Sequence, residues 1–266
     1  MNMNFKILSI SLIALSIISC NIKTDGNFMN FAVKEGTGPV ISKSFDGNFD
    51  EIKVVQGINA TVVKSDQEKV SISAPNDIID ELLVENNGGR LYIHFKPNIQ
   101  IRSNQFKVTI YAKDFNKLEA NSSGRIEIKD QFTQDRTDIK ATSSGSINGF
   151  LEANTMNIDV SSSGTFSGRI WANDLIGEVS SSGDIKVKGK VKNATVSASS
   201  SGDFNAPELV VENANFKASS SGSIAAGVSH ELRGAASSSG DIIINRKGNI
   251  NVIESKESSS GRVKIN

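Results

Sequence analysis

Serine hydroxyl groups recur in a fixed pattern through the second half of the sequence. A Ser-Ser-Gly or Ser-Ser-Ser-Gly block occurs eight times. A serine needs a neighbouring base to act as a nucleophile, but the two histidines, His94 and His230, belong to no motif. The Gly-X-Ser-X-Gly turn of serine hydrolases is also missing from the sequence. These serines therefore indicate hydrogen bonding, and the sequence predicts no enzyme.

Two aspartates, Asp184 and Asp203, each follow the glycine of successive blocks. Stacked carboxylates repel each other unless a cation or water lies between them, so these two residues are weak candidates for a calcium site. Calcium-binding nonapeptide repeats carry Gly-Gly-X-Gly-X-Asp in every coil, and that pattern is missing here. We therefore expect no metal site. Because the sequence also lacks a phosphate-binding loop and a Cys/His cluster, it predicts no cofactor.

The N-terminal residues look like a bacterial lipoprotein signal. Lys6 precedes an apolar stretch over residues 7–18, which is shorter than the roughly 20 residues of a membrane span. The stretch runs into Ile-Ile-Ser-Cys, an arrangement that resembles a lipobox and assigns lipidation to Cys20, the only cysteine of the chain. We predict a signal peptide over residues 1–19 and a polar tether over residues 20–38. An ordinary signal peptide and an uncleaved anchor are the alternatives.

A lipid-carrying Cys20 would tether the mature chain to a membrane, which is thus one predicted partner. The expected location is the cell envelope, as an outer-membrane lipoprotein that faces either the periplasm or the cell surface. The chain balances 29 basic against 29 acidic side chains. Proteins that coat nucleic acid need a basic surplus or a basic face, so nucleic acid is not expected as a partner.

The serine blocks also mark an internal repeat. A near-constant period of about 20 residues is typical of a solenoid. The glycines of the blocks, which lie 18 to 21 residues apart, are Gly124, Gly145, Gly164, Gly183, Gly202, Gly222, Gly240 and Gly261.

Apolar residues keep fixed positions relative to each glycine. The residue two places after the glycine is large and apolar in every repeat, and the residue four places before it is alanine or valine except at Glu257. The positions between are mostly polar, so the pattern alternates with period two, as strands with one buried face do. The sequence predicts an all-β fold, a parallel β-helix with coils of about 20 residues. Each coil would hold two or three short strands, about 4.8 Å from the next coil.

The glycine of each block is expected to mark a corner of the coil. The backbone there needs either a positive φ or a close approach to another segment. A propeller or a sandwich is the alternative fold, although both need longer antiparallel units. A low-complexity Ser/Gly linker is disfavoured because the apolar alternation continues between the blocks.

Residues 39–120 lack the serine blocks but retain short runs of β-branched and aromatic residues. Residues 77–83 could form one short helix. We predict that residues 39–120 form less regular N-terminal coils and a cap over the open end of the core, since terminal solenoid units are commonly atypical. Residues 121–266 then form the regular repeat β-helix.

Strand alternation assigns a direction to each serine of a block. The middle serine shares the parity of the apolar columns, so we predict that it points inward into a stack of hydroxyl groups. If the strand is straight up to the glycine, the flanking serines point outward as a flat hydroxyl lattice that could bind a repetitive ligand. The alternative is that a tight corner simply requires small, soluble residues. The candidate binding face comprises Ser144, Ser161, Ser163, Ser180, Ser182, Ser199, Ser201, Ser219 and Ser221.

Several segments together resemble one known family. They are residues 57–62 (Gly-Ile-Asn-Ala-Thr-Val), 89–93 (Gly-Arg-Leu-Tyr-Ile), 107–111 (Lys-Val-Thr-Ile-Tyr) and 118–124 (Leu-Glu-Ala-Asn-Ser-Ser-Gly), with the serial Ser-Ser-Gly blocks. Over about residues 45–266 the chain resembles the head GIN domain family of auto-transporter adhesins, which is common among envelope lipoproteins of Bacteroidetes-type bacteria. The resemblance implies a right-handed parallel β-helix of pectin-lyase-like type. It implies adhesion only through the family's name, and it carries over no catalytic residue.

The expected function is that of a lipid-anchored, non-catalytic envelope protein that binds an extended polymer, a glycan or another protein. Trp171, with Phe150, Phe166 and Phe204 in the same region, could stack on a sugar, although such residues more often lie in the core. The runner-up is a polysaccharide lyase or glycosidase of pectin-lyase-like fold, which places charged residues on one outer face. Charged side chains in a groove across three or four coils would favour the enzyme, and a flat polar face would favour binding.

Overall fold

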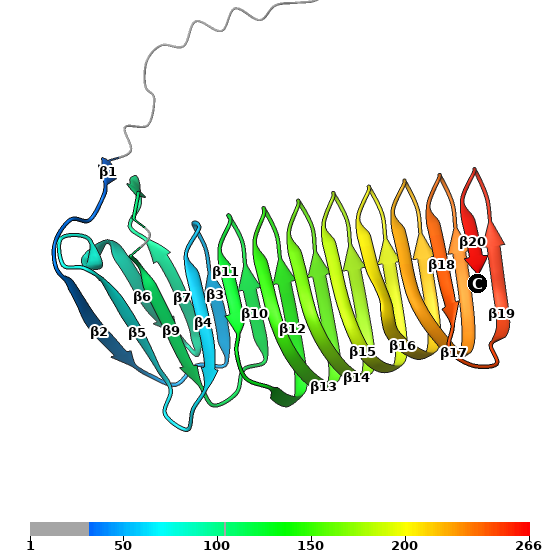
Figure 1. Cartoon of the computed structure of the whole chain (residues 1–266), viewed down its shortest axis with the longest axis horizontal. Coiled ribbons are helices and arrows are strands. Elements are labelled where there is room, and N and C mark those ends of the chain that lie inside the picture. Colours follow the sequence, from blue (N-terminus) through cyan, green and yellow to red (C-terminus); the bar gives the residue numbers. More distant parts are fainter. Residues whose placement is uncertain (1–31, 104) are drawn as a thin grey trace, which may run out of the picture.

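Each central repeat of the C-terminal half consists of one long strand and one tight turn. A computed structural model describes residues 32–103 and 105–266. Five repeats each form a strand of 14 to 16 residues: β13 (Ser146–Val160), β14 (Thr165–Val179), β15 (Asp184–Ala198), β16 (Asp203–Ala218) and β17 (Ser223–Ala236). Figure 1 shows that each strand runs along one side of the solenoid, bends at the lower edge and returns along the other side. The strand thus continues round the bend, where two or three separate strands were expected.

Neighbouring strands pair in parallel, one coil beside the next. β13 pairs with β14 from Ser146 opposite Thr165 to Val160 opposite Val179, without a break in register. β16 is one residue longer than β15. The extra residue shifts the register of the pair between Ile185 opposite Phe204 and Gly189 opposite Leu209. The result is a parallel β-solenoid of about eight turns with coils about 19 residues apart, which confirms the predicted fold class.

Six further strands complete the regular coils at both ends. They are β10 (Lys117–Ala120), β11 (Arg125–Ile128), β12 (Phe132–Ala141), β18 (Asp241–Arg246), β19 (Asn251–Glu257) and β20 (Arg262–Ile265). At the N-terminal end, β10 and β11 pair in parallel with strands of the irregular part. The two parts therefore share one hydrogen-bonded sheet.

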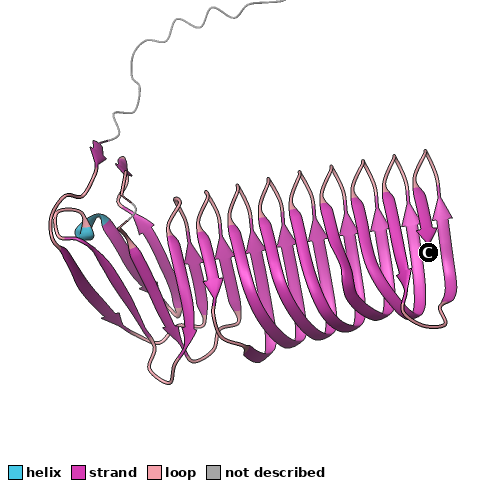
Figure 2. Cartoon of the chain, viewed as in Figure 1, coloured by secondary structure: helices cyan, strands magenta, loops and turns pink. Residues whose placement is uncertain are grey.

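The N-terminal part mixes parallel and antiparallel strands. Its strands are β1 (Ala32–Lys34), β2 (Val40–Asp46), β3 (Glu51–Val54), β4 (Asn59–Lys64), β5 (Lys69–Pro75), β6 (Leu82–Asn87), β7 (Arg90–Phe95), β8 (Ile99–Ile101) and β9 (Lys107–Ala112). Antiparallel pairs join β2 to β5, β5 to β9 and β6 to β7. In Figure 2 these strands lie at one end of the solenoid.

The short helix expected at residues 77–83 is reduced to a single 3-10 turn, η1 (Ile79–Glu81). The helix stops there because Leu82 already pairs with Phe95 at the start of β6. Among the described residues, no helix is long and apolar enough to cross a membrane.

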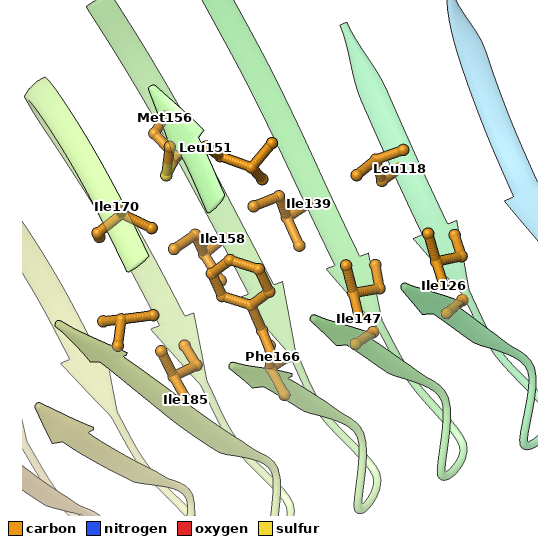
Figure 3. Packing of buried hydrophobic residues seen from close by; sticks show 14 of the residues in the cluster. Leu118, Ile126, Ile139, Ile147, Leu151, Met156, Ile158, Phe166, Ile170 and Ile185 are labelled. Atoms are coloured by element: carbon orange, nitrogen blue, oxygen red, sulfur yellow. The ribbon is translucent and has the colours of Figure 1, made fainter. Parts of the chain in front are cut away.

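Inward side chains of successive coils form one continuous apolar core (Figure 3). Gly177 occupies an inward column between Ile158 and Val196. A Cβ at this position would lie 3.3 Å from Val196 and 3.7 Å from the ring of Phe204. The missing side chain leaves room for these larger neighbours, which is how a close-packed core accommodates residues of unequal size. The column two residues after each block glycine is buried at Ile126, Ile147, Phe166, Ile185, Phe204, Ile224 and Ile242.

An outward column of charged side chains links the two parts of the sheet. Lys53, Glu119, Lys140, Asp159 and Glu178 are register partners on successive strands. The Glu119 carboxylate, in a residue that is only 8% exposed, lies 2.8 Å from the Lys53 ammonium. Lys140 pairs with Asp159 at 2.6 Å. The opposite charges that face each other from Lys53 to Asp159 stabilise the pairing of the strands that carry them.

Glu119 gives the protein a predictable response to acid. Burial raises the pKa of Glu119. The hydrogen bond from Lys53 and the charges of Lys53, Arg90 and Lys117 lower it by more than burial raises it, so the pKa lies below its usual value. A lowered pKa stabilises the fold above the unfolded-state pKa of about 4.3. This stabilisation is lost as the pH falls through the lowered pKa of the folded state.

We expect Glu119→Gln to destabilise the protein by about 1–2 kcal/mol at neutral pH, because Lys53 and Arg90 lose a charged partner. The difference from the unsubstituted protein should shrink below about pH 4. Thermal unfolding between pH 3 and pH 7 measures this. Glu178→Gln, which changes an exposed carboxylate of the same column, is the control and should shift the melting temperature little. Equal pH dependence of both variants would contradict the assignment.

Candidate functional site

The serine blocks form two-residue turns between the coils. In the block at residues 161–164, the Gly164 N–H donates to the Ser161 carbonyl at 2.9 Å. The two central residues have positive φ, 52° at Ser162 and 60° at Ser163. Two successive positive φ values are the signature of a type I′ turn, which suits the twist of the strands that it joins. Every one of the eight blocks has positive φ at both central serines.

The prediction that the middle serines point into the core is wrong. All eight are exposed: Ser122, Ser143, Ser162, Ser181, Ser200, Ser220, Ser238 and Ser259. Strand alternation assigns inward and outward directions only while the backbone is extended, and the backbone stops being extended after the first residue of each block. The positive φ values turn the middle serine outward instead.

The flat two-row lattice is wrong for the same reason, because its condition of a straight strand is not met. The third serines Ser144, Ser163, Ser182, Ser201 and Ser221 are exposed, and the first serines Ser161, Ser180, Ser199 and Ser219 are half-buried. In Figure 1 the turns line up as a row of tips along the upper edge of the solenoid. We call this row, formed by the middle and third serines, the serine ridge.

Backbone hydrogen bonds connect each turn of the ridge to the next. The Ser163 N–H donates to the Ser181 carbonyl at 3.1 Å, and the Ser182 N–H donates to the Ser200 carbonyl at 3.2 Å. Throughout the stack, the N–H of the third serine of one turn donates in this way to the carbonyl of the middle serine of the next turn. The ridge is therefore an ordered extension of the sheet.

The block glycines are required by close packing between coils and not by a positive φ. A Cβ on Gly164 would lie 2.2 Å from the Ala141 carbonyl oxygen of the preceding coil, and a Cβ on Gly145 would lie 2.1 Å from that of Ala120. Neither glycine has a positive φ. Of the two reasons expected for a glycine at the corner, the close backbone approach is thus the one that applies.

The first turn of the stack carries the Gly-Ile-Asn motif. Gln56 and Gly57 have φ of 57° and 71°, and the Ile58 N–H donates to the Val55 carbonyl at 3.2 Å. The Gly57 N–H donates to the Ser122 carbonyl of the next turn at 3.0 Å. Gly57 and Ile58 thus occupy the places of the third serine and the glycine of a block, so this motif begins the stack.

The two candidate metal ligands are direct neighbours in the sheet. Asp184 on β15 pairs in register with Asp203 on β16. Asp184 is engaged by Lys186, and the Ser223 hydroxyl donates to Asp203 at 2.5 Å. Each carboxylate thus has a partner within the protein, while Oδ1 of Asp184 is buried without a hydrogen-bond partner among the residues that the structure describes. Within the described residues, no group of three potential metal ligands occurs.

A groove that the sequence analysis did not identify lies around Trp171 on β14. Trp171 is 44% exposed, although residues of this kind were expected mostly in the core. It separates two hollows, of about 580 Å³ and about 450 Å³, and lines both of them. We call the two hollows together the Trp171 groove. The sequence analysis named Trp171 as a residue that could stack on a sugar, but it gave no signal for the hollows on either side of it.

Side-chain amides form ordered rows beside this tryptophan. The Asn154 amide donates to the Asp135 carboxylate at 3.0 Å, and the Asn173 amide donates to Asn154 at 3.0 Å. In the next column, Asn193 donates to Asp174 at 2.9 Å and Asn213 donates to Asn193 at 2.9 Å. These bonds hold the polar groups in place from coil to coil.

His94 lies on β7, and His230 lies on β17. The His94 ring stacks on Tyr92 with centroids 4.2 Å apart, and its Nδ1 lies 2.9 Å from the Phe95 carbonyl oxygen. His230 is exposed on its strand. Cys20 lies outside the described residues.

Comparison with known proteins assigns the chain to a family. The family described as "Putative auto-transporter adhesin, head GIN domain" matches residues 48–249, which is well over half of the chain. The protein belongs to this head GIN domain family. The resemblance seen around Gly57-Ile58-Asn59 and the serine blocks is thereby confirmed. Membership supports an adhesin-like, envelope-associated protein.

Solved structures of similar proteins share the fold of this head GIN domain protein. A "putative adhesin" from Parabacteroides distasonis has a TM-score of 0.80 at 22% identity, covering 88% of this chain and 100% of its own. A "putative lipid binding protein" from the same species has a TM-score of 0.74 at 22% identity, covering 88% and 99%. A "putative adhesin" from Parabacteroides merdae has a TM-score of 0.77 at 18% identity, with the same coverage. None of these three is described as an enzyme.

A search of curated proteins found no match to this chain. The family and the solved structures therefore carry the comparison, and at these identities the structures bear on the fold alone.

Proposed function

We propose that the protein is a lipid-anchored adhesin of the cell envelope that binds an extended polymer, such as a glycan chain, without cleaving it. The observation that carries this proposal is the register of the outer surface. Equivalent positions recur once per coil along an unbroken parallel ladder, so a polymer with repeating units can meet the same position of the coil, such as a turn serine, on successive coils. Family membership supports the adhesin-like part of the proposal.

The anchor is the part of this proposal that rests on sequence alone. We expect the full chain, expressed in a bacterium that processes lipoproteins, to incorporate a labelled fatty acid, and Cys20→Ala to abolish the label. Cell fractionation would then place the labelled chain in the outer membrane. A full chain that carries no label would contradict the lipoprotein assignment while leaving polymer binding open to its own test.

The third serines of the serine ridge belong to the binding face that the sequence analysis proposed. Its hydroxyls are exposed and regularly spaced, but its turn geometry also explains the small residues without a ligand. A double variant, Ser182→Gly with Ser201→Gly, tests the ridge without strain, because glycine adopts the positive φ of these positions freely. Ser197→Ala, at an exposed serine within β15, is the matched control.

The test screens the full chain in detergent on arrays of glycans and envelope polymers, with and without calcium, and scores both retention and cleavage products. Retention without cleavage supports the proposed function. Loss of retention in the serine double variant, but not in Ser197→Ala, assigns the ridge as the contact surface. Unchanged retention assigns the serines to folding. The absence of retention on all polymers would contradict polymer binding.

A polysaccharide-cleaving enzyme is the second candidate, and one observation favours it. The larger hollow of the Trp171 groove is lined by Asp50, Asp114, Asp135 and Glu152, and glycosidases use pairs of carboxylates. Three of these carboxylates already accept hydrogen bonds within the protein, from Asn116, Asn154 and Thr133. Cleavage products in the screen would establish the enzyme and overturn the adhesin proposal.

A further inference from the structure

We infer that the Trp171 groove is a carbohydrate-binding site, in which a glycan chain runs along the solenoid axis with one sugar ring stacked on the indole. This inference rests on the proposed function, since it names the site and the chemical class of the polymer. It is argued from the exposure of Trp171, the order of the neighbouring side chains and the distribution of charge in the two hollows.

The fold does not require an aromatic residue at position 171. Its register partners on the adjacent coils are Glu152 on β13 and Lys190 on β15, and the next partners along the column are Thr133 and Val210. The coil thus forms with small, charged or branched side chains in this column. A tryptophan left 44% exposed presents a broad apolar ring face to solvent, on which a flat ligand can stack. Tryptophan combines a large flat face with one polar donor, which suits a ligand that has apolar and polar surfaces.

The backbone of this region is already occupied by hydrogen bonds. β14 pairs along its length with β13 on one side and β15 on the other. A peptide cannot add to a strand whose backbone groups are paired on both sides. Recognition here must therefore proceed through side chains, and the side chains present are one indole, several amides and several charges.

The polar side chains beside Trp171 are held before a ligand arrives. Asn173, two residues along β14, belongs to the row in which Asn173 donates to Asn154 and Asn154 donates to Asp135. Fixed side chains lose little conformational entropy on binding. Amide and carboxylate oxygens arranged around an apolar ring face match a sugar, whose ring face is apolar and whose rim carries hydroxyl groups.

The two hollows carry opposite charge. The larger one contains four carboxylates, and its Arg136 is engaged by the carboxylate of Asp138 at 3.0 Å. The smaller one contains Lys190 and Lys192 together with Glu212. The larger hollow accepts hydrogen bonds from hydroxyl or amino groups and repels carboxylates. We therefore assign the larger hollow to a neutral or amino-bearing sugar unit, and we expect a polymer made of uronic acid alone to bind the groove more weakly.

Trp171 is the only tryptophan of the chain, so its fluorescence reports on this site alone. The full chain in detergent would be titrated with laminarin as the neutral polymer, chitosan as the amino-bearing polymer and polygalacturonate as the uronic acid polymer. We expect laminarin or chitosan to shift the emission to shorter wavelength and to protect the indole from acrylamide quenching. Polygalacturonate should do so only at higher concentration.

Binding would also be measured by pull-down for three variants. Trp171→Ala should weaken binding about tenfold, because it removes the stacking contact. Trp171→Phe should restore most of the affinity. Ile176→Ala removes an apolar side chain of the same strand that is 49% exposed but does not line either hollow, and it should bind as the unsubstituted protein does.

The outcomes separate this inference from the proposed function. One outcome is that a polymer binds without changing the fluorescence of Trp171 and with the same affinity for Trp171→Ala as for the unsubstituted protein. That result overturns the site but supports the proposed adhesin. Binding of a peptide ligand at Trp171 overturns the carbohydrate assignment. Retention of no polymer by the unsubstituted protein overturns both.

Discussion

Replacing Gly164 with alanine is expected to destabilise the β-helix by about 3 kcal/mol. The new Cβ would lie 2.2 Å from the carbonyl oxygen and 2.5 Å from the carbonyl carbon of Ala141. Both are backbone atoms, and the Ala141 carbonyl accepts the Ser161 N–H at 3.0 Å. The clash can be relieved only by separating two coils, which breaks the inter-coil hydrogen bonds of the turn. Chemical unfolding followed by circular dichroism measures the loss.

The adjacent position provides the matched control. Ser163→Gly changes a residue with φ of 60°, a region that costs a residue with a Cβ roughly 1–2 kcal/mol. Glycine removes this cost but also gains freedom in the unfolded chain, so the net change should stay within about 1 kcal/mol. Two substitutions one residue apart should thus differ clearly. If Gly164→Ala unfolds at the same denaturant concentration as the unsubstituted protein, the close approach of the coils is contradicted.

Replacing Phe204 with alanine is expected to cost about 3–5 kcal/mol. Phe204 on β16 is fully buried, with 0% of its surface exposed. It lies between Ile185 and Ile224 in its column, and Gly177 leaves space for its ring. Alanine would open a cavity that the neighbouring coils cannot close, because their hydrogen-bonded register holds them at a fixed spacing.

Phe204→Leu is the control for cavity size and should cost less than Phe204→Ala, since most of the volume is kept. Hydrogen exchange would show where the fold loosens, because neighbouring repeats are coupled mainly to each other. We expect faster exchange in β15, β16 and β17 than in β3 and β4. A uniform loss of protection along the whole chain would contradict the nearest-neighbour account.

The periodicity of the sequence was sufficient to predict the fold. Large apolar residues two places after each glycine, such as Ile147 and Phe166, recur with the coil and are buried as predicted. A parallel ladder repeats each position at the same point of the coil, so a column in the sequence becomes a column in space. The family could be recognised for the same reason, because Gly57-Ile58-Asn59 and the serine blocks occupy equivalent turns of that ladder.

The direction of the serines was predicted incorrectly because a rule for strands was applied to a turn. Ser162 and Ser163 have positive φ, and this conformation is uncommon for residues other than glycine. The sequence therefore pointed to the glycine as the special residue, yet Gly164 needs only the absence of a Cβ. The serines adopt the positive φ and the glycine provides the close approach because one turn stacks on the next. This stacking is a contact between residues about 19 positions apart in the sequence.

The sequence by itself determined the repeat, the buried face of each strand and the family. Only the tertiary structure decided which side chains gather on the surface. Trp171 lies beside Asp135 and Glu152 from two other coils and beside Lys192 from a third. These residues are brought together by the register of β12, β13, β14 and β15. Periodicity predicts columns along the axis, but the neighbours across a bend depend on where each strand turns, and no local pattern in the sequence specifies that.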